Sequence, residues 1–124
     1  MTRRIPYTGQ IPYMTARLTV SGYRPTAASR FAVVRVNADA PWSLIHTRSG
    51  MPVNSLLPAL SRKVTLADKL AVAAAFEAQT HLDWAAFDEL QELGPGFNGT
   101  QYMDPAKGAA LAVTLRQLAG QVLA

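Results

Sequence analysis

The first half of the chain alternates apolar and polar positions with the two-residue period of a β-strand. Three stretches show this alternation or a matching enrichment in β-branched and aromatic residues, namely 14–20, 30–36 and 42–48. Residues 37–41, "NADAP", supply turn residues between the last two stretches. We therefore expect these two stretches to pair as an antiparallel hairpin within a small sheet.

The segments that flank these strands each allow two interpretations. The tripeptide "IPY" occurs twice before the first strand, and Pro6 and Pro12 cannot donate hydrogen bonds to a sheet ladder. Residues 1–13 are therefore expected to be either an edge strand or an extended, polyproline-like arm. Residues 53–63 fit either a fourth short strand or a turn of helix that is broken at Pro58.

In the second half of the chain, apolar residues recur every three or four positions, which is the period of an amphipathic helix. This spacing predicts three helices, over 65–79, 81–93 and 105–123. The first helix has a clear start signal, because Thr65 is followed three residues later by Asp68, the spacing of a capping box.

Strands that come first and helices that follow indicate an α+β fold rather than alternating α/β units. With 124 residues, the chain is long enough for one core and too short for two ordinary domains. We predict a single domain over residues 1–124. In it, an antiparallel sheet of three or four strands, built from residues 14–55, packs against about three helices within 65–123.

The composition favours a folded protein that does not cross a membrane. Apolar residues make up 49% of the chain and charged residues 16%, which argues against wholesale disorder. The longest strongly apolar run, "LAVAAAF", is far shorter than the roughly 20 residues that span a bilayer. Prolines and a glycine interrupt the start of the chain, where a signal peptide would be apolar, so we expect a cytoplasmic protein. The lack of cysteine excludes disulfides and thiolate chemistry.

Charge is distributed unevenly along the chain. Residues 1–64 carry nine cationic side chains, eight of them arginine, against a single acidic one, a net charge of +8. Residues 65–124 carry three cationic side chains against seven acidic ones, a net charge of −4. Arginine binds phosphate or carboxylate groups through two parallel hydrogen bonds, so the first half fits nucleic acid or an acidic protein surface. In the alternative, the two halves pack together and the arginines only solvate the rim of the sheet.

The connection between the first two predicted strands, residues 21–29, exceeds the length of about two to five residues that hairpins usually use. Tyr23 gives this segment an aromatic face, and Arg24 and Arg30 flank it. A basic hairpin tip with an aromatic residue is typical of sites that hold a phosphate backbone and stack a base. In the alternative interpretation, Tyr23 folds back over the core and the loop has no binding role.

These observations define two sets of candidate binding residues. The strand and loop set, expected to meet nucleic acid or a protein partner, consists of Arg17, Tyr23, Arg24, Arg30, Arg35 and Arg48. The glycine-containing segment 94–104 is a second candidate, because loops of that length are usually functional or flexible. Its Phe97, Tyr102 and Met103 are expected to contact a partner or, alternatively, to cover the helix pair.

No pattern of residues indicates a catalytic, metal or cofactor site. "GPGFNG" at 94–99 has the letters of a dinucleotide-binding motif, but it follows a predicted helix instead of a strand. His46 has only one acidic residue in its half of the chain, Asp39, which lies in a predicted turn, so a catalytic triad is not indicated. His81 lies near Glu77 but has no second histidine at metal-ligand spacing. We therefore expect no enzymatic activity and no cofactor.

The sequence favours a non-enzymatic binding module whose arginine-rich strand and loop surface binds nucleic acid. The alternative is a protein-interaction or self-assembling adaptor, in which the basic half meets an acidic surface of a partner or of a second copy. A homodimer is a further hypothesis, with Trp42, Phe97 and Tyr102 at the apolar centre of the contact.

Overall fold

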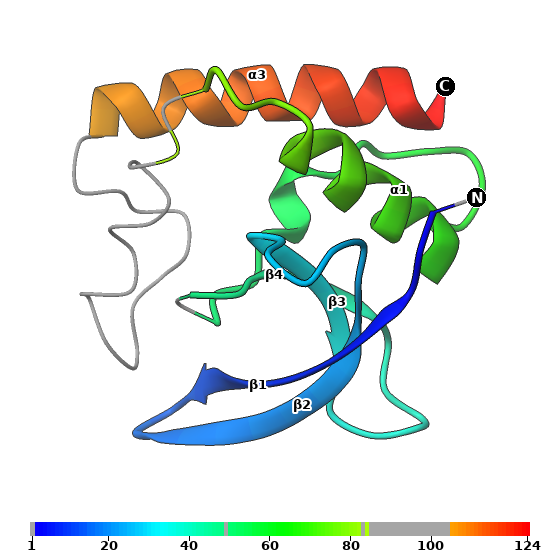
Figure 1. Cartoon of the computed structure of the whole chain (residues 1–124), viewed down its shortest axis with the longest axis vertical. Helices are drawn as coiled ribbons and strands as arrows, with labels where there is room; N and C mark the ends of the chain where they lie inside the picture. The colour runs from blue at the N-terminus through cyan, green and yellow to red at the C-terminus, as the bar shows by residue number, and fades with distance from the viewer. Residues whose placement is uncertain (1, 49, 83, 85–104) are drawn as a thin grey trace.

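The structure is a computed structural model that describes residues 2–48, 50–82, 84 and 105–124. It confirms the predicted α+β class, with a four-stranded antiparallel sheet in the order β1-β2-β3-β4 followed by helices (Figure 1). The strands are β1 (Ile5–Tyr13), β2 (Ala16–Arg24), β3 (Phe31–Arg35) and β4 (Ser43–His46). The helices are the 3₁₀-helix η1 (Asn54–Leu56) and the α-helices α1 (Leu66–Glu77) and α3 (Pro105–Leu123). Within the described residues, neither α-helix is both long and apolar enough to cross a bilayer.

The first segment of the chain is the edge strand β1, which was one of its two interpretations. β1 pairs with β2 along its whole length, beginning with Ile5 opposite Arg24, so the two strands form a long hairpin. The turn of this hairpin contains Met14 in the left-handed region, with a φ of 53°. The sheet therefore runs from Ile5 to His46 instead of occupying residues 14–55.

The predicted loop at 21–29 is shorter than expected, because Ser21–Arg24 belong to β2 and pair with β1 on one side. On the other side, part of this segment pairs with β3. A Cβ atom at Gly22 would clash with the carbonyl oxygen of Val33 on β3, so glycine allows the two backbones to approach closely here. The glycine that suggests a turn in the sequence is thus part of a strand, and residues 25–30 alone connect β2 to β3.

Residues 53–63 contain no regular strand, and their helical alternative is limited to the short η1. The chain before η1 covers the outer side of β4 instead. Pro52 makes an isolated β-bridge with Ile45, and the N–H of Val53 donates to the carbonyl of Leu44 at 2.8 Å. The fourth strand of the sheet is therefore β1 and not the segment after β4.

Both faces of the central strand β3 are buried, which follows from its nearly continuous apolar sequence. On one face, Phe31 and Val33 join Leu44 of β4 and the apolar stripes of α1 and α3 in the main core. On the opposite face, a smaller cluster contains Val20, Ala32, Val34 and Ile45. Tyr7 and Ile11 of β1 pack against this smaller cluster, so the β1–β2 hairpin covers the face that the helices leave open (Figure 1).

The helix α1 has the predicted start signal. The N–H of Asp68 donates to the hydroxyl of Thr65 at 3.2 Å, and the N–H of Thr65 donates to the carboxylate of Asp68 at 2.8 Å, which completes the capping box. The third predicted helix is present as α3. The second predicted helix, 81–93, lies almost entirely outside the described residues, and its first positions, His81 and Leu82, lie in a turn and a bend. Among the described residues, two α-helices therefore accompany the sheet, and not three.

Candidate functional site

Two neighbouring rungs of the sheet, meaning rows of residues that face one another across adjacent strands, carry polar and aromatic side chains on the same face. The first rung consists of Pro6, Tyr23, Val33 and Leu44, and the second of Thr8, Ser21 and Arg35. The two rungs are two residues apart on every strand that they share, so their side chains point to one face of the sheet. Because Val33 and Leu44 belong to the main core, this face is the one that the helices partly cover.

An arginine–aromatic row, which consists of Arg4, Tyr23, Trp42 and Arg35, crosses this part of the face. The guanidinium carbon of Arg4 lies 5.9 Å from the ring centre of Tyr23. The ring centres of Tyr23 and Trp42 are 6.0 Å apart, with the rings inclined by 41°. At the other end, the guanidinium carbon of Arg35 lies 4.2 Å from the ring centre of Trp42. These distances match cation–π and aromatic contacts, so the four side chains form one stacked series.

The row borders a hollow of 310 Å³, called here the sheet hollow. Its lining residues come from three strands and from the residue before β4: Pro6, Tyr7, Thr8, Ser21, Gly22, Tyr23, Arg35 and Trp42. Thr8 and Ser21 are exposed, whereas Tyr23 and Trp42 are half-buried. The sheet hollow therefore combines flat aromatic surface, hydroxyl groups that donate or accept hydrogen bonds, and the positive charge of Arg35.

Contacts with the rest of the fold hold the row in place. Trp42 packs against the main core, and its carbonyl accepts a hydrogen bond of 2.7 Å from the Nζ of Lys69 on α1. The guanidinium of Arg35 donates to the carbonyl of Ala38 at 3.0 Å. Burial lowers the pKa of Lys69, and the positive charge of Lys63 lowers this pKa further. Lys69 of α1 thus places an amino group next to the row, at the backbone of Trp42.

Arg24 was expected to act together with Tyr23, but the structure places the two on opposite faces of the sheet, because they are consecutive residues of β2. The guanidinium carbon of Arg24 lies 5.1 Å from the ring centre of Tyr7. Burial raises the pKa of Tyr7, and the positive charge of Arg24 opposes this rise. Within the described part of the chain, the buried Nε of Arg24 has no hydrogen-bond partner.

Arg30 is bound to the helix α1 instead of standing beside Tyr23. Its backbone N–H donates to the Oε2 of Glu77 at 3.0 Å, and its Nη1 lies 4.0 Å from the Oε1 of Glu77. Its guanidinium carbon also lies 5.2 Å from the ring centre of the buried Trp84. These contacts join the β2–β3 connection to α1, which is a structural role.

The remaining predicted residues lie away from the row or outside the described residues. Arg17 is exposed on β2, six residues before Tyr23, which is roughly 20 Å along an extended strand. Arg48 is exposed in the turn after β4, at the opposite end of that strand from Trp42. Phe97, Tyr102 and Met103 lie outside the described residues. Of the predicted set, the structure therefore brings together Tyr23 and Arg35.

Two members of the row were not predicted as nucleic-acid contacts. Trp42 was expected only at the centre of a homodimer contact, and Arg4 was not a candidate. A signal for Trp42 was present, since the two-residue period places it on the same face as Leu44 and places Arg35 on the same face as Val33. Pairing of the two strands as a hairpin then makes Trp42 and Arg35 neighbours. Arg4 could be placed only once β1 was known to pair with β2.

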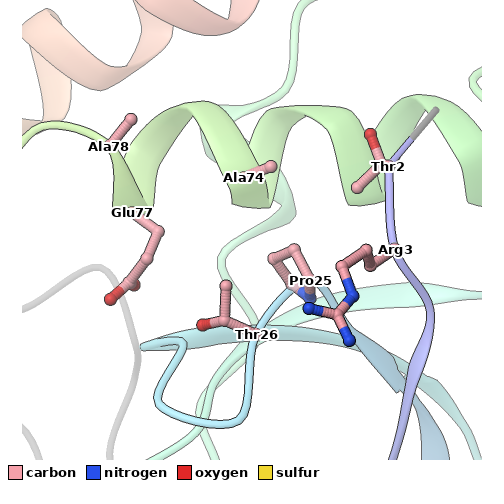
Figure 2. A pocket seen from close by; sticks show the side chains of 7 residues that line it. All are labelled: Thr2, Arg3, Pro25, Thr26, Ala74, Glu77 and Ala78. Carbon is pink, nitrogen blue, oxygen red and sulfur yellow. The ribbon is translucent and has the colours of Figure 1, made fainter.

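A second hollow, of 620 Å³, lies between the start of the chain, the β2–β3 connection and α1 (Figure 2). It is called here the Arg3–Glu77 hollow, and its lining consists of Thr2, Arg3, Pro25, Thr26, Ala74, Glu77 and Ala78. It shares no residue with the sheet hollow. The two hollows are therefore separate depressions on the described part of the surface.

Neither hollow has the features of a metal centre, since no group of three or more His, Cys, Asp or Glu side chains that could hold a metal ion is found among the described residues. Comparison with other proteins adds no assignment. No protein-family model, curated protein or solved structure matches this chain.

Proposed function

We propose that this protein is a non-enzymatic module that binds single-stranded nucleic acid on the sheet, at the sheet hollow. The observation that supports the proposal most strongly is the arginine–aromatic row, in which Arg4 and Arg35 flank the rings of Tyr23 and Trp42. Two rings that border a hollow offer a surface on which unpaired bases stack. The flanking guanidinium groups suit the phosphates that connect those bases.

The chemistry of the sheet hollow favours an unpaired strand over a duplex. Stacking on aromatic side chains requires bases that have left their own stack, as in single strands and loops. Each such base contributes about 1–3 kcal/mol when it stacks on an aromatic ring. The hydroxyls of Thr8 and Ser21 lie in the same hollow and suit base edges, sugar hydroxyls or phosphate oxygens.

The groups in the sheet hollow also suit binding better than catalysis. Its lining residues bring aromatic rings, hydroxyls and a guanidinium group, and they include no carboxylate or imidazole to act as a general acid or base. Electrostatic attraction would be independent of base sequence, and the net charge of +4 would support it at low salt.

The proposal is tested by fluorescence anisotropy with a labelled oligothymidylate of about 12 nucleotides and the corresponding duplex, at several salt concentrations. If about three phosphates are neutralised, log affinity should fall with log salt concentration with a slope of roughly −2. Arg4→Ala and Arg35→Ala should each flatten this slope by about 0.7. Tyr23→Leu keeps an apolar side chain but removes the ring, so affinity should fall while the slope stays the same.

Arg116→Ala is the charge-matched control, because Arg116 lies on α3, outside the sheet hollow, and its Nε donates to the carbonyl of Ser55 at 3.1 Å. It should change the slope less than Arg4→Ala or Arg35→Ala does. If no oligonucleotide binds at low salt, the proposal is wrong, and the acidic protein surface becomes the better hypothesis. If Arg116→Ala weakens binding as much as Arg35→Ala, the affinity belongs to overall charge and not to the row.

A further inference from the structure

The Arg3–Glu77 hollow is an open depression whose lining combines charged, hydroxyl and apolar groups. Its volume of 620 Å³ falls within the range of about 300–1,000 Å³ that is typical of such sites. Figure 2 shows Glu77 extending from α1 and Arg3 extending from the start of the chain, with Pro25 and Thr26 between them. A negative and a positive group thus border one hollow from different segments.

Both charged groups retain hydrogen-bonding capacity. Among the described residues, no hydrogen bond or ion pair engages the guanidinium of Arg3. The carboxylate of Glu77 accepts the backbone N–H of Arg30 and lies 4.0 Å from its Nη1. A carboxylate offers about four lone-pair positions, so Glu77 can accept further hydrogen bonds from a ligand. The hydroxyl of Thr26 adds one more donor or acceptor to the same hollow.

Apart from two threonines, the uncharged part of the lining consists of short apolar side chains. Pro25 is buried, and Ala74 of α1 lies four residues before Ala78, the C-cap residue of this helix. Their methyl groups leave the space that larger side chains would fill. A ligand that spans the hollow from Arg3 to Glu77 would therefore lay an apolar stem beside Pro25 and Ala74.

From this arrangement we propose that the Arg3–Glu77 hollow binds a small zwitterion whose ammonium and carboxylate groups are held apart by an apolar stem, as in ω-amino acids and short peptides. The ammonium group pairs with Glu77 and the hydroxyl of Thr26, and the carboxylate pairs with Arg3. A ligand with one charge would contact either Arg3 or Glu77 but not both, and Glu77 would keep only its contacts with Arg30. This inference is independent of the proposed nucleic-acid binding, because no residue of the arginine–aromatic row lines this hollow.

The test is an NMR titration of the full chain with ε-aminocaproate, with hexylamine and hexanoate as analogues of the same carbon number that carry one charge each. We expect ε-aminocaproate to shift the amide resonances of Thr26 and Ala78 in a saturable way. The two analogues should bind about tenfold more weakly, because each lacks one charge-assisted contact. Arg3→Gln should weaken the binding of ε-aminocaproate by a similar factor, whereas the charge-matched control Arg116→Gln should not.

Glu77→Gln should also weaken binding, and its amide oxygen can still accept the N–H of Arg30. If this variant does not fold, Ala78→Leu tests the same site, because a larger side chain at this exposed C-cap position fills part of the hollow without changing Glu77. The proposal is overturned if ε-aminocaproate produces no saturable shifts at tens of millimolar, the weak end of small-ligand affinities. Equal binding of the analogues, or equal loss in Arg3→Gln and Arg116→Gln, would overturn it as well.

Discussion

The guanidinium of Arg35 stacks on the ring of Trp42, with 4.2 Å between the guanidinium carbon and the ring centre, across the turn that joins β3 to β4. The same guanidinium donates to the carbonyl of Ala38 inside this turn. A planar, delocalised cation suits both contacts, whereas an ammonium group lacks the flat face.

Replacement of Arg35 by lysine therefore separates the charge of this residue from its stacking. Arg35→Lys should lower the affinity for single-stranded oligonucleotides about three- to tenfold, because the row loses its planar end. The dependence on salt should stay unchanged, since the positive charge remains. Anisotropy titrations of the two proteins at matched salt concentrations check this. An affinity equal to that of the unsubstituted protein would mean that Arg35 acts only as a charge.

Gly22 should be necessary for the sheet. A Cβ atom at this position would clash with the carbonyl of Val33, so Gly22→Ala should lower the free energy of unfolding by about 1–3 kcal/mol, as overpacking does in a core. Urea denaturation followed by circular dichroism measures the change. Gly120→Ala is the matched control, because a Cβ atom at Gly120 of α3 meets no atom within 4 Å. This control should stabilise the protein by roughly 0.5–1 kcal/mol, since alanine favours helix. Equal effects of the two substitutions would contradict the close approach of β2 and β3.

The start of α1 should make stability depend on acid pH. The hydrogen bond from Arg62 and the N–H of Thr65 lower the pKa of Asp68 from 3.8 to about 2. Because this pKa is lower in the folded chain than in the unfolded chain, Asp68 stabilises the fold fully above about pH 4. The contribution is lost as the pH falls from about 4 towards about 2.

We therefore expect Asp68→Asn to reduce the loss of stability over this pH window, as measured by urea unfolding at a series of pH values. Asp39→Asn is the control, because Asp39 is exposed in the β3–β4 turn and caps no helix. The assignment fails if both variants follow the pH dependence of the unsubstituted protein.

Arg30 should contribute to stability and not to binding. Loss of its contacts with Glu77 and Trp84 should lower the free energy of unfolding of Arg30→Ala by about 1 kcal/mol. The affinity for oligonucleotides should change much less than in Arg35→Ala, because Arg30 lies outside the sheet hollow. Urea denaturation and anisotropy on the same variant measure both effects. A normal stability with a large loss of affinity would return Arg30 to the binding surface.

Local signals in the sequence were sufficient to predict the positions of several helices and strands. The capping box at Thr65 and Asp68 marks the start of α1, and enrichment in β-branched and aromatic residues marks β3. The β1–β2 hairpin was not recognised, because its turn at Met14 and Thr15 contains none of the glycine, asparagine or proline residues that usually indicate a turn. The position of this hairpin depends on which strands pair and in which register. A single sequence does not reveal this pairing.

The candidate site was less predictable for the same reason. Tyr23 and Arg24 are neighbours in sequence, and the glycine and proline around them suggested one loop that presents both side chains. Since the segment is a strand, the pleat directs them to opposite faces. The row depends instead on the register of the sheet. This register brings Arg4, which precedes β1, next to Tyr23 of β2, and it brings Tyr23 next to the residues on the two sides of the β3–β4 turn. Composition identified the relevant residue types, arginine and aromatic, but not their arrangement.

The two prolines of β1 have a consequence for how copies of this chain meet one another in a crowded solution. An edge strand with free N–H and C=O groups is a template on which another molecule can add a strand, and this process leads towards fibrils. Pro6 and Pro12 are an even number of residues apart, so their nitrogens point to the same side of β1, and β2 occupies the other side. An incoming strand would find no donor at either position and would have only Tyr7–Ile11 between them. The two prolines therefore disfavour the addition of a strand from another copy at this edge of the sheet.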